Sequence, residues 1–156
     1  MTSFGTHRRV DYAAADMFAL VCDVEAYPQF VPLCEGMRVV SRSRSGDGVE
    51  VIVADMEVGF KAICERFTSR VACNAQKLEV LVEYINGPFK KLENRWAFRD
   101  EPTRPGETPR SVIEFYISYE FRSFALGVLM GAMFDKAFQK YADAFTKRAG
   151  EVYGRR

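Results

Sequence analysis

The C-terminal part of the chain begins with an uncharged run and continues as an amphipathic segment. Residues 124–134 (FALGVLMGAMF) carry no charge over eleven positions. Eleven apolar residues are far fewer than the roughly 20 that cross a bilayer. Beyond this run, apolar residues recur at intervals of three and four, which gives one stripe along a helix. The stripe consists of Leu126, Met130, Met133, Phe134, Ala137, Phe138, Tyr141, Ala144 and Phe145. The segment is therefore predicted to be a helix that packs on the rest of the chain.

A period-two alternation dominates residues 37–121. It is clearest near the end, where Ile113, Phe115, Ile117 and Tyr119 alternate with more polar residues. A period of two places such a set on one face of an antiparallel sheet. Turn-forming residues divide this region into strands that we expect at 37–44, 49–58, 60–73, 77–85, 92–100 and 111–121. A further short strand is expected at 7–12.

Helices are predicted on both sides of this strand region. Two short ones follow the first strand, at 14–22 and 28–33, and Pro28 suits the first turn of the second. The last helix, 124–150, would be roughly 40 Å long. This order predicts an α+β fold in which the helices pack on one face of a curved antiparallel sheet of about six or seven strands. The space between sheet and long helix would be either a filled core or a cavity, and the residue spacing leaves both open.

Composition narrows the classes of function. One domain over residues 1–156 is the natural prediction, and 48% hydrophobic with 28% charged residues is typical of a soluble globular protein. A net charge of +1 supplies no overall field that would attract nucleic acid or an anionic membrane. The four cysteines show no metal-binding spacing, so we expect buried, reduced thiols, no metal site and a cytoplasmic protein.

Residues for catalysis are sparse. The only histidine, His7, lies near the N-terminus, and the sequence offers neither a Ser-His-Asp or Cys-His set nor a glycine-rich phosphate loop. We therefore expect a protein that binds rather than catalyses, with no catalytic residues and no cofactor.

Five stretches together resemble a known family. They are MFALVCDVEAYPQFVPLC (17–34), VGFKAICERFTSRV (58–71), YINGPFKKLENRWAF (84–98), FYISYEFRS (115–123) and ADAFTKRA (142–149). They are similar to the coenzyme Q-binding START-like family of the polyketide cyclase-like superfamily, which also contains bacterial RatA-type ribosome-association toxins. The resemblance implies the helix-grip fold (START-like, Bet v 1-like), a curved sheet around a long C-terminal helix. One departure is Leu33, where the family usually has tryptophan.

The resemblance implies, first, the binding of a polyprenyl quinone. Our preferred hypothesis is that ubiquinone occupies an apolar cavity and is delivered to respiratory complexes at the cytoplasmic face of the inner membrane. Methionine and aromatic side chains suit an irregular lipid. The expected ligand-binding residues are Phe30, Leu33, Trp96, Phe115, Ile117, Tyr119, Met130, Met133, Phe134, Ala137 and Phe138. The first turns of the last helix are apolar nearly all round, so a loop, a membrane or a partner is expected to cover them.

The alternative function is binding of the large ribosomal subunit, which would block subunit association. Its support in the sequence is a basic strand with Arg38, Arg42 and Arg44, and a basic C-terminus that ends in Arg155 and Arg156. These arginines could contact RNA or an anionic membrane. A solvated strand edge that discourages pairing would look the same, so the sequence leaves this choice open.

Overall fold

Seven antiparallel strands form one sheet in the computed structural model, which describes residues 2–60 and 63–154. Arg155 and Arg156 lie outside the described residues. In chain order the elements are β1 (Thr2–Val10), α1 (Ala14–Cys22), the 3₁₀ helix η1 (Val24–Gln29), β2 (Cys34–Arg44), β3 (Glu50–Phe60), β4 (Ile63–Asn74), β5 (Glu79–Asn86), β6 (Phe89–Asp100), β7 (Ser111–Phe121), α2 (Phe124–Gln139) and α3 (Tyr141–Tyr153).

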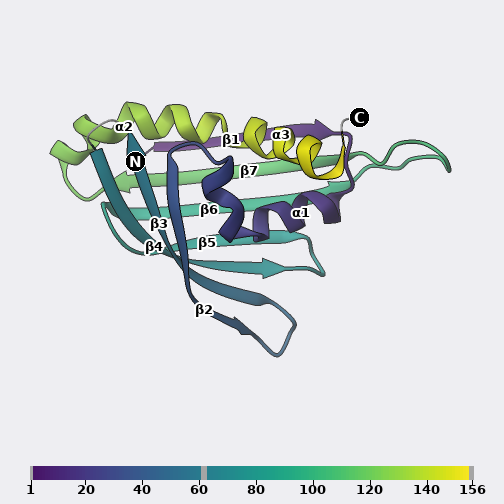
Figure 1. The fold of residues 1–156 in the computed structure, drawn as a ribbon, viewed down its shortest axis with the longest axis horizontal. Helices are drawn as coiled ribbons and strands as arrows, with labels where there is room; N and C mark the ends of the chain where they lie inside the picture. Colours follow the sequence, from purple (N-terminus) through teal and green to yellow (C-terminus); the bar gives the residue numbers. More distant parts are fainter. Residues whose placement is uncertain (1, 61–62, 155–156) are drawn as a thin grey trace.

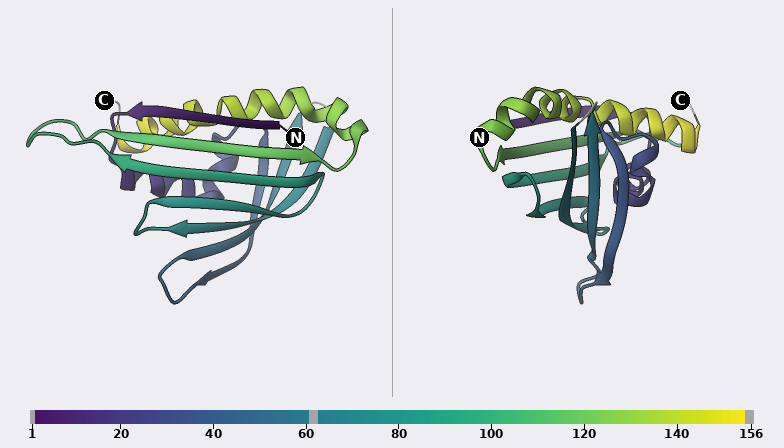
Figure 2. Two further views of the ribbon diagram at one scale, coloured as in Figure 1. Left: turned by 180° about the vertical axis from the view of Figure 1, so that it is seen from behind. Right: turned by 60° about the vertical axis from the view of Figure 1, so that its left-hand side comes forward.

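The sheet is a meander closed at one edge by the first strand. Its order is β1-β7-β6-β5-β4-β3-β2, so β1 pairs with the last strand and every other neighbour is a hairpin partner. Register shifts interrupt the β2–β3, β4–β5 and β6–β7 ladders, and such bulges bend a strand and increase its twist. Seen from behind, β1, β7 and β6 lie in front of the helices, while β2 to β4 swing away at a steep angle (Figures 1 and 2). The helices therefore share the concave face.

The alternation predicted for the strands is confirmed. On β7 the side chains of Ile113, Phe115, Ile117 and Tyr119 are at most 2% exposed, while Tyr116 between them is 40% exposed. The inward rows of the other strands and the inner sides of the helices complete one continuous core. The α+β helix-grip architecture expected from the sequence is therefore present.

The prediction of a single long C-terminal helix was wrong in one respect. The helix breaks at Lys140 into α2 and α3. The last turn of α2 tightens there, so that the Lys140 N–H donates to the carbonyls of Ala137 and Phe138. The chain then restarts as α3 at Tyr141. The break lets Phe138 and Tyr141, whose rings lie 5.3 Å apart, both face the interior of the curved sheet.

The second short helix was also misplaced. It is a 3₁₀ helix at Val24–Gln29, directly after α1, and Pro28 lies inside it rather than at its start. Burial explains the shift: Val24 is 1% exposed, and the Tyr27 hydroxyl donates to the carbonyl of Val21. These contacts draw the segment onto the core before Pro28 is reached.

All four cysteines are free thiols, as expected, but they are not all buried. Cys34 and Cys73 are buried, Cys22 is half-buried, and Cys64 on β4 is exposed. The expectation was wrong for Cys64 because its position on β4 falls on the outward row.

Candidate functional site

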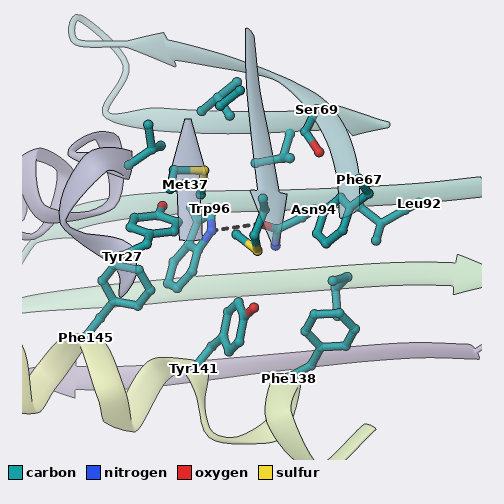
Figure 3. Close-up of a pocket in the computed structure, with 16 residues that line it drawn as sticks. Tyr27, Met37, Phe67, Ser69, Leu92, Asn94, Trp96, Phe138, Tyr141 and Phe145 are labelled. Carbon is teal, nitrogen blue, oxygen red and sulfur yellow. Dashed lines mark hydrogen bonds between the residues drawn. The ribbon is translucent and has the colours of Figure 1, made fainter. Parts of the chain in front are cut away.

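A small cavity lies where the curved sheet meets the junction of α2 and α3. Its volume is about 60 Å³, which is room for a few water molecules. The wall draws on every strand except β1 and on both C-terminal helices. It consists of Val24, Tyr27, Met37, Ala54, Met56, Phe67, Ser69, Val71, Val82, Leu92, Asn94, Trp96, Ile117, Phe138, Tyr141 and Phe145 (Figure 3). Small-molecule sites usually measure several hundred Å³, so the cavity is too small for such a ligand in this conformation.

Aromatic rings form the helix side of the cavity and its floor. Trp96 on β6 lies 5.1 Å from Phe145 of α3, with the rings edge to face. Tyr27 of η1 also contacts Phe145, at 5.5 Å between ring centroids. Edge-to-face geometry is favourable for such rings, so the strand, the 3₁₀ helix and the last helix are joined through one aromatic cluster.

Besides Tyr27, whose hydroxyl donates to the Val21 carbonyl, three polar side chains interrupt this apolar wall: Ser69 on β4, Asn94 on β6 and Tyr141 at the start of α3. The Asn94 amide donates to the carbonyl of Tyr116 and accepts from the Trp96 indole, both at 2.9 Å. The buried Ser69 hydroxyl has no hydrogen-bond partner within residues 2–60 and 63–154. The Ser69 and Tyr141 hydroxyls point into the same space from the sheet side and the helix side (Figure 3).

No charged residue lines the cavity among the residues that the structure describes. Burial raises the pKa of Tyr141 well above that of a free tyrosine, because the ionised form would lose its hydration. Tyr27 has its pKa raised for the same reason. Both phenols are therefore neutral at ordinary pH, and the cavity suits an uncharged group.

The structure separates the sequence-predicted ligand-binding residues into groups. Trp96, Ile117 and Phe138 line the cavity. Phe115, Tyr119, Met130 and Phe134 are buried in the surrounding core without lining it.

A second group of predicted residues lies outside, along α2. Leu33, Met133 and Ala137 line an open groove of about 510 Å³ between α2, the turn before β2 and the start of β4. Leu33 has a left-handed backbone (φ 66°), which is strained for a leucine. Phe30 belongs to neither space: it packs on Phe145 at 5.0 Å, and the Arg148 guanidinium lies 5.2 Å from its ring.

Sequence reasoning missed the polar members of the wall. Ser69 follows Phe67 and precedes Val71 on the inward row of β4, and Asn94 lies between Leu92 and Trp96 on that of β6. A polar residue in an apolar row of period two is a recognisable sign of a buried polar site. Tyr141 was part of the helix stripe, but only the break at Lys140 explains how it reaches the cavity.

The arginine strand is less basic than the sequence indicated. Arg38 pairs with Asp55 at 2.8 Å, and Arg42 pairs with Glu25 at 2.5 Å. Arg44 is exposed and has no ion pair among the described residues. Two of the three predicted contacts for RNA or a membrane are thus neutralised by neighbouring carboxylates.

The described part of the chain also lacks the features of two other kinds of site. It contains no group of three or more His, Cys, Asp or Glu side chains placed to hold a metal ion. It also contains no helix that is both long and apolar enough to cross a membrane.

Comparison with known proteins places this architecture in a family. The family model for polyketide cyclase / dehydrase and lipid transport matches residues 10–146. The ribosome association toxin RatA of Escherichia coli is 34% identical over 147 residues, which are 94% of this chain and 86% of RatA. The mitochondrial coenzyme Q-binding protein COQ10 homolog B of Xenopus laevis is 31% identical over 92% of this chain, but this match spans only 56% of that relative.

A solved structure agrees with these matches. The solution structure of an 18 kDa protein from Caulobacter crescentus is 33% identical, with a TM-score of 0.75 over 99% of this chain and 100% of that one. The names of the RatA and COQ10 relatives describe association and binding, not catalysis. The chain belongs to the polyketide cyclase / dehydrase and lipid transport family.

Proposed function

We propose that this protein is a non-enzymatic carrier that binds a polyprenyl quinone, ubiquinone, between its curved sheet and its C-terminal helices. The observation that carries the proposal is the character of the cavity wall: aromatic and aliphatic, uncharged, and interrupted by a few hydrogen-bonding groups. Such a wall fits a neutral ring with polar substituents better than a fatty acid or a phospholipid headgroup, whose charge would be buried without a partner. The name of the Xenopus relative points to the same ligand.

Quinone binding is tested directly by extracting lipid from the purified protein and by adding a short-tailed ubiquinone. The only tryptophan, Trp96, lines the cavity, so a bound quinone should quench its fluorescence. At 100 times its Kd the ligand would stabilise the fold by about 2.7 kcal/mol and raise Tm by roughly 5 to 10 °C. If no quinone co-purifies and added quinone changes neither fluorescence nor Tm, the proposal fails.

The closed cavity requires part of the wall to move before a quinone can enter, and α2 is the element best suited to do so. Gly127 and Gly131 lie inside the helix, and each weakens it by about 1 kcal/mol relative to alanine. Beneath it, the buried Tyr119 hydroxyl has no hydrogen-bond partner among the residues that the structure describes. With Ser123 at one end and the break at Lys140 at the other, α2 can move as a lid.

Replacing both glycines of α2 with alanine should slow quinone uptake. An added Cβ meets nothing within 4 Å at Gly131 and only Phe121, at 3.8 Å, at Gly127, so both substitutions fit. They should stabilise the helix by about 1 to 2 kcal/mol and reduce the association rate measured by Trp96 quenching. Gly46→Ala, in the open turn between β2 and β3, is the control and should leave the rate unchanged. An unaltered rate in the stabilised double variant would show that the ligand enters elsewhere.

The outer side of α2 supports delivery at a membrane surface. Phe124, Val128 and Leu129 are 89%, 70% and 61% exposed. Lys136 and Lys140 continue the same side of the helix at the groove. Exposed apolar side chains flanked by lysines are typical of helices that lie in the interface of an anionic bilayer. We therefore place the opening of the lid at the membrane.

Vesicle flotation checks this orientation. Leu129→Glu should abolish binding to vesicles that contain anionic phospholipid, because a carboxylate would replace an inserted apolar side chain. Val40→Glu is the matched control, since Val40 on β2 is 52% exposed but does not line the groove along α2. Equal loss in both variants, or none in either, would contradict docking through α2.

The second candidate function is association with the ribosome, favoured by the name of the Escherichia coli relative, and we place it on the large subunit as the family resemblance implies. Of the arginine strand, Arg44 is the residue without a described ion pair, and Arg42 is held by Glu25. Co-sedimentation with 50S subunits at low salt tests this function, with Arg42 and Arg44 changed to glutamate to test the strand. If the unchanged protein does not pellet with the subunits, ribosome binding is excluded. If the glutamate variant still pellets, the arginine strand is not the contact surface.

A further inference from the structure

The Ser69 hydroxyl is a fully buried cavity group with no hydrogen-bond partner among the described residues. Ser69 is 7% exposed, its Oγ has no hydrogen-bond partner, and it lines the cavity. A hydroxyl that is buried without a partner destabilises the fold, whereas alanine at this position would pack without that cost. The residue type is therefore better suited to an occupied cavity than to an empty one.

A bulge on the neighbouring strand β5 lies beside this side chain. The β4–β5 ladder shifts register between Thr68 and Ser69: Thr68 pairs with Asn86 and Ser69 with Tyr84, so that Ile85 is left out. Bulges of this kind re-aim side chains and are common beside active sites. Ser69 follows Phe67 on the inward row, and its hydroxyl faces the space between the sheet and the helices (Figure 3).

The other polar groups around this space can also donate. The Tyr141 hydroxyl makes no hydrogen bond to the described residues, and its raised pKa keeps it protonated. Asn94 uses one N–H for the Tyr116 carbonyl and its oxygen for Trp96, which leaves the second N–H of its amide. The cavity thus has three hydrogen-bond donors and no charged residue in its wall. Such a site favours a neutral ligand group that carries acceptor oxygens.

We propose that Ser69 is the specificity-determining contact for the ring of the ligand: its hydroxyl donates to a ring carbonyl oxygen, with Asn94 and Tyr141 beside it. This inference rests on the proposed function and adds the orientation of the ligand. The carbonyl-bearing ring enters the cavity, and the isoprenoid tail leads out past α2 toward the groove lined by Leu33 and Met133.

The test compares two ligands in two variants. The ligands are ubiquinone with two isoprene units and an isoprenoid hydrocarbon of the same tail length without the ring. Ser69→Ala should weaken the quinone about tenfold, the loss expected for one hydrogen bond, and leave the hydrocarbon unchanged. It should also keep or raise Tm, because it removes an unpaired hydroxyl. Ser118→Ala removes a buried hydroxyl that does not line the cavity and should leave both affinities unchanged.

The outcomes separate the two proposals. If the unchanged protein binds no quinone, the proposed function fails and the contact fails with it. If the unchanged protein binds quinone and Ser69→Ala binds it equally well, the function stands and the contact is overturned. A tenfold loss for the hydrocarbon as well would show a packing effect and would likewise overturn the contact. Ser69→Thr, which keeps the hydroxyl, should retain more quinone affinity than Ser69→Ala.

Discussion

Replacing Gly87 with alanine should destabilise the protein by more than about 3 kcal/mol, which lowers Tm by roughly 6 to 12 °C. Two effects add. The backbone φ of +148° is one that residues with a side chain rarely adopt, and a Cβ would stand 2.4 Å from Cβ and 3.0 Å from Cα of Phe67. The Phe67 backbone is fixed by pairing of β4 with β3 and cannot retreat. Thermal or urea unfolding measures the loss.

The position matters because the β5–β6 turn presents Phe89 to the core. The Phe89 ring contacts Phe67, Tyr119 and Phe134 within 6 Å between centroids, so it joins β4 and β7 to the helix α2. Displacing the turn would therefore loosen α2 as well as the strands.

Gly106→Ala is the control that separates strain from collision. Gly106 also has a positive φ, +85°, but nothing lies within 4 Å of its added Cβ. Gly106→Ala should lower the free energy of unfolding by about 1 to 2 kcal/mol, the usual penalty for a left-handed residue with a side chain. If Gly87→Ala cost no more than Gly106→Ala, the close approach to Phe67 would not be the reason for glycine.

The sheet could be predicted from the sequence because its faces differ so strongly. The strand 111–121 was placed at its observed bounds, since buried residues such as Phe115 alternate with exposed ones such as Tyr116. Strand ends near bulges were less accurate: β6 begins at Phe89, before the predicted 92, where the register with β7 shifts. Local alternation is lost at a bulge, so the pattern cannot show where pairing begins.

The break at Lys140 could not be predicted because the chain has neither glycine nor proline there. The apolar stripe continues across it from Phe138 to Phe145 as if the helix were unbroken. The break accompanies tertiary packing: beyond the tightened last turn of α2, the rings of Phe138 and Tyr141 lie 5.3 Å apart and both line the cavity. Helix periodicity reports which residues face the core but not how the axis bends around it.

The candidate site was only partly predictable for a related reason. Large apolar residues mark the whole core, so Phe115 and Phe134 were chosen together with Trp96 and Phe138, although only the latter two line the cavity. The informative residues were polar ones in apolar rows, Ser69 and Asn94. Neighbours from other strands decide which of these two residues keeps an unpaired hydrogen-bonding group. Only the structure shows those neighbours.

Phe145→Ala should have the largest effect on stability, a loss of about 3 to 5 kcal/mol, because it leaves a void in a packed interior. Phe145 is 1% exposed, and its ring contacts Trp96 and Tyr27. Roughly 10 °C of Tm would be lost. Phe124→Ala removes the same atoms from a side chain that is 89% exposed, and it should change stability by less than about 0.5 kcal/mol.

The same variant also tests where the ligand binds. Phe145 lines the cavity of about 60 Å³, so the void joins that cavity and makes room for a ring without movement of α2. Empty apolar cavities take up small aromatic molecules, so added short-tailed ubiquinone should raise Tm more in Phe145→Ala than in the unchanged protein. Movement of α2 should still limit the association rate, because Phe145 is 1% exposed and its truncation opens no path to solvent. Equal Tm shifts in both proteins would place the quinone outside the cavity, and a larger shift with much faster association would show that α2 does not gate the cavity.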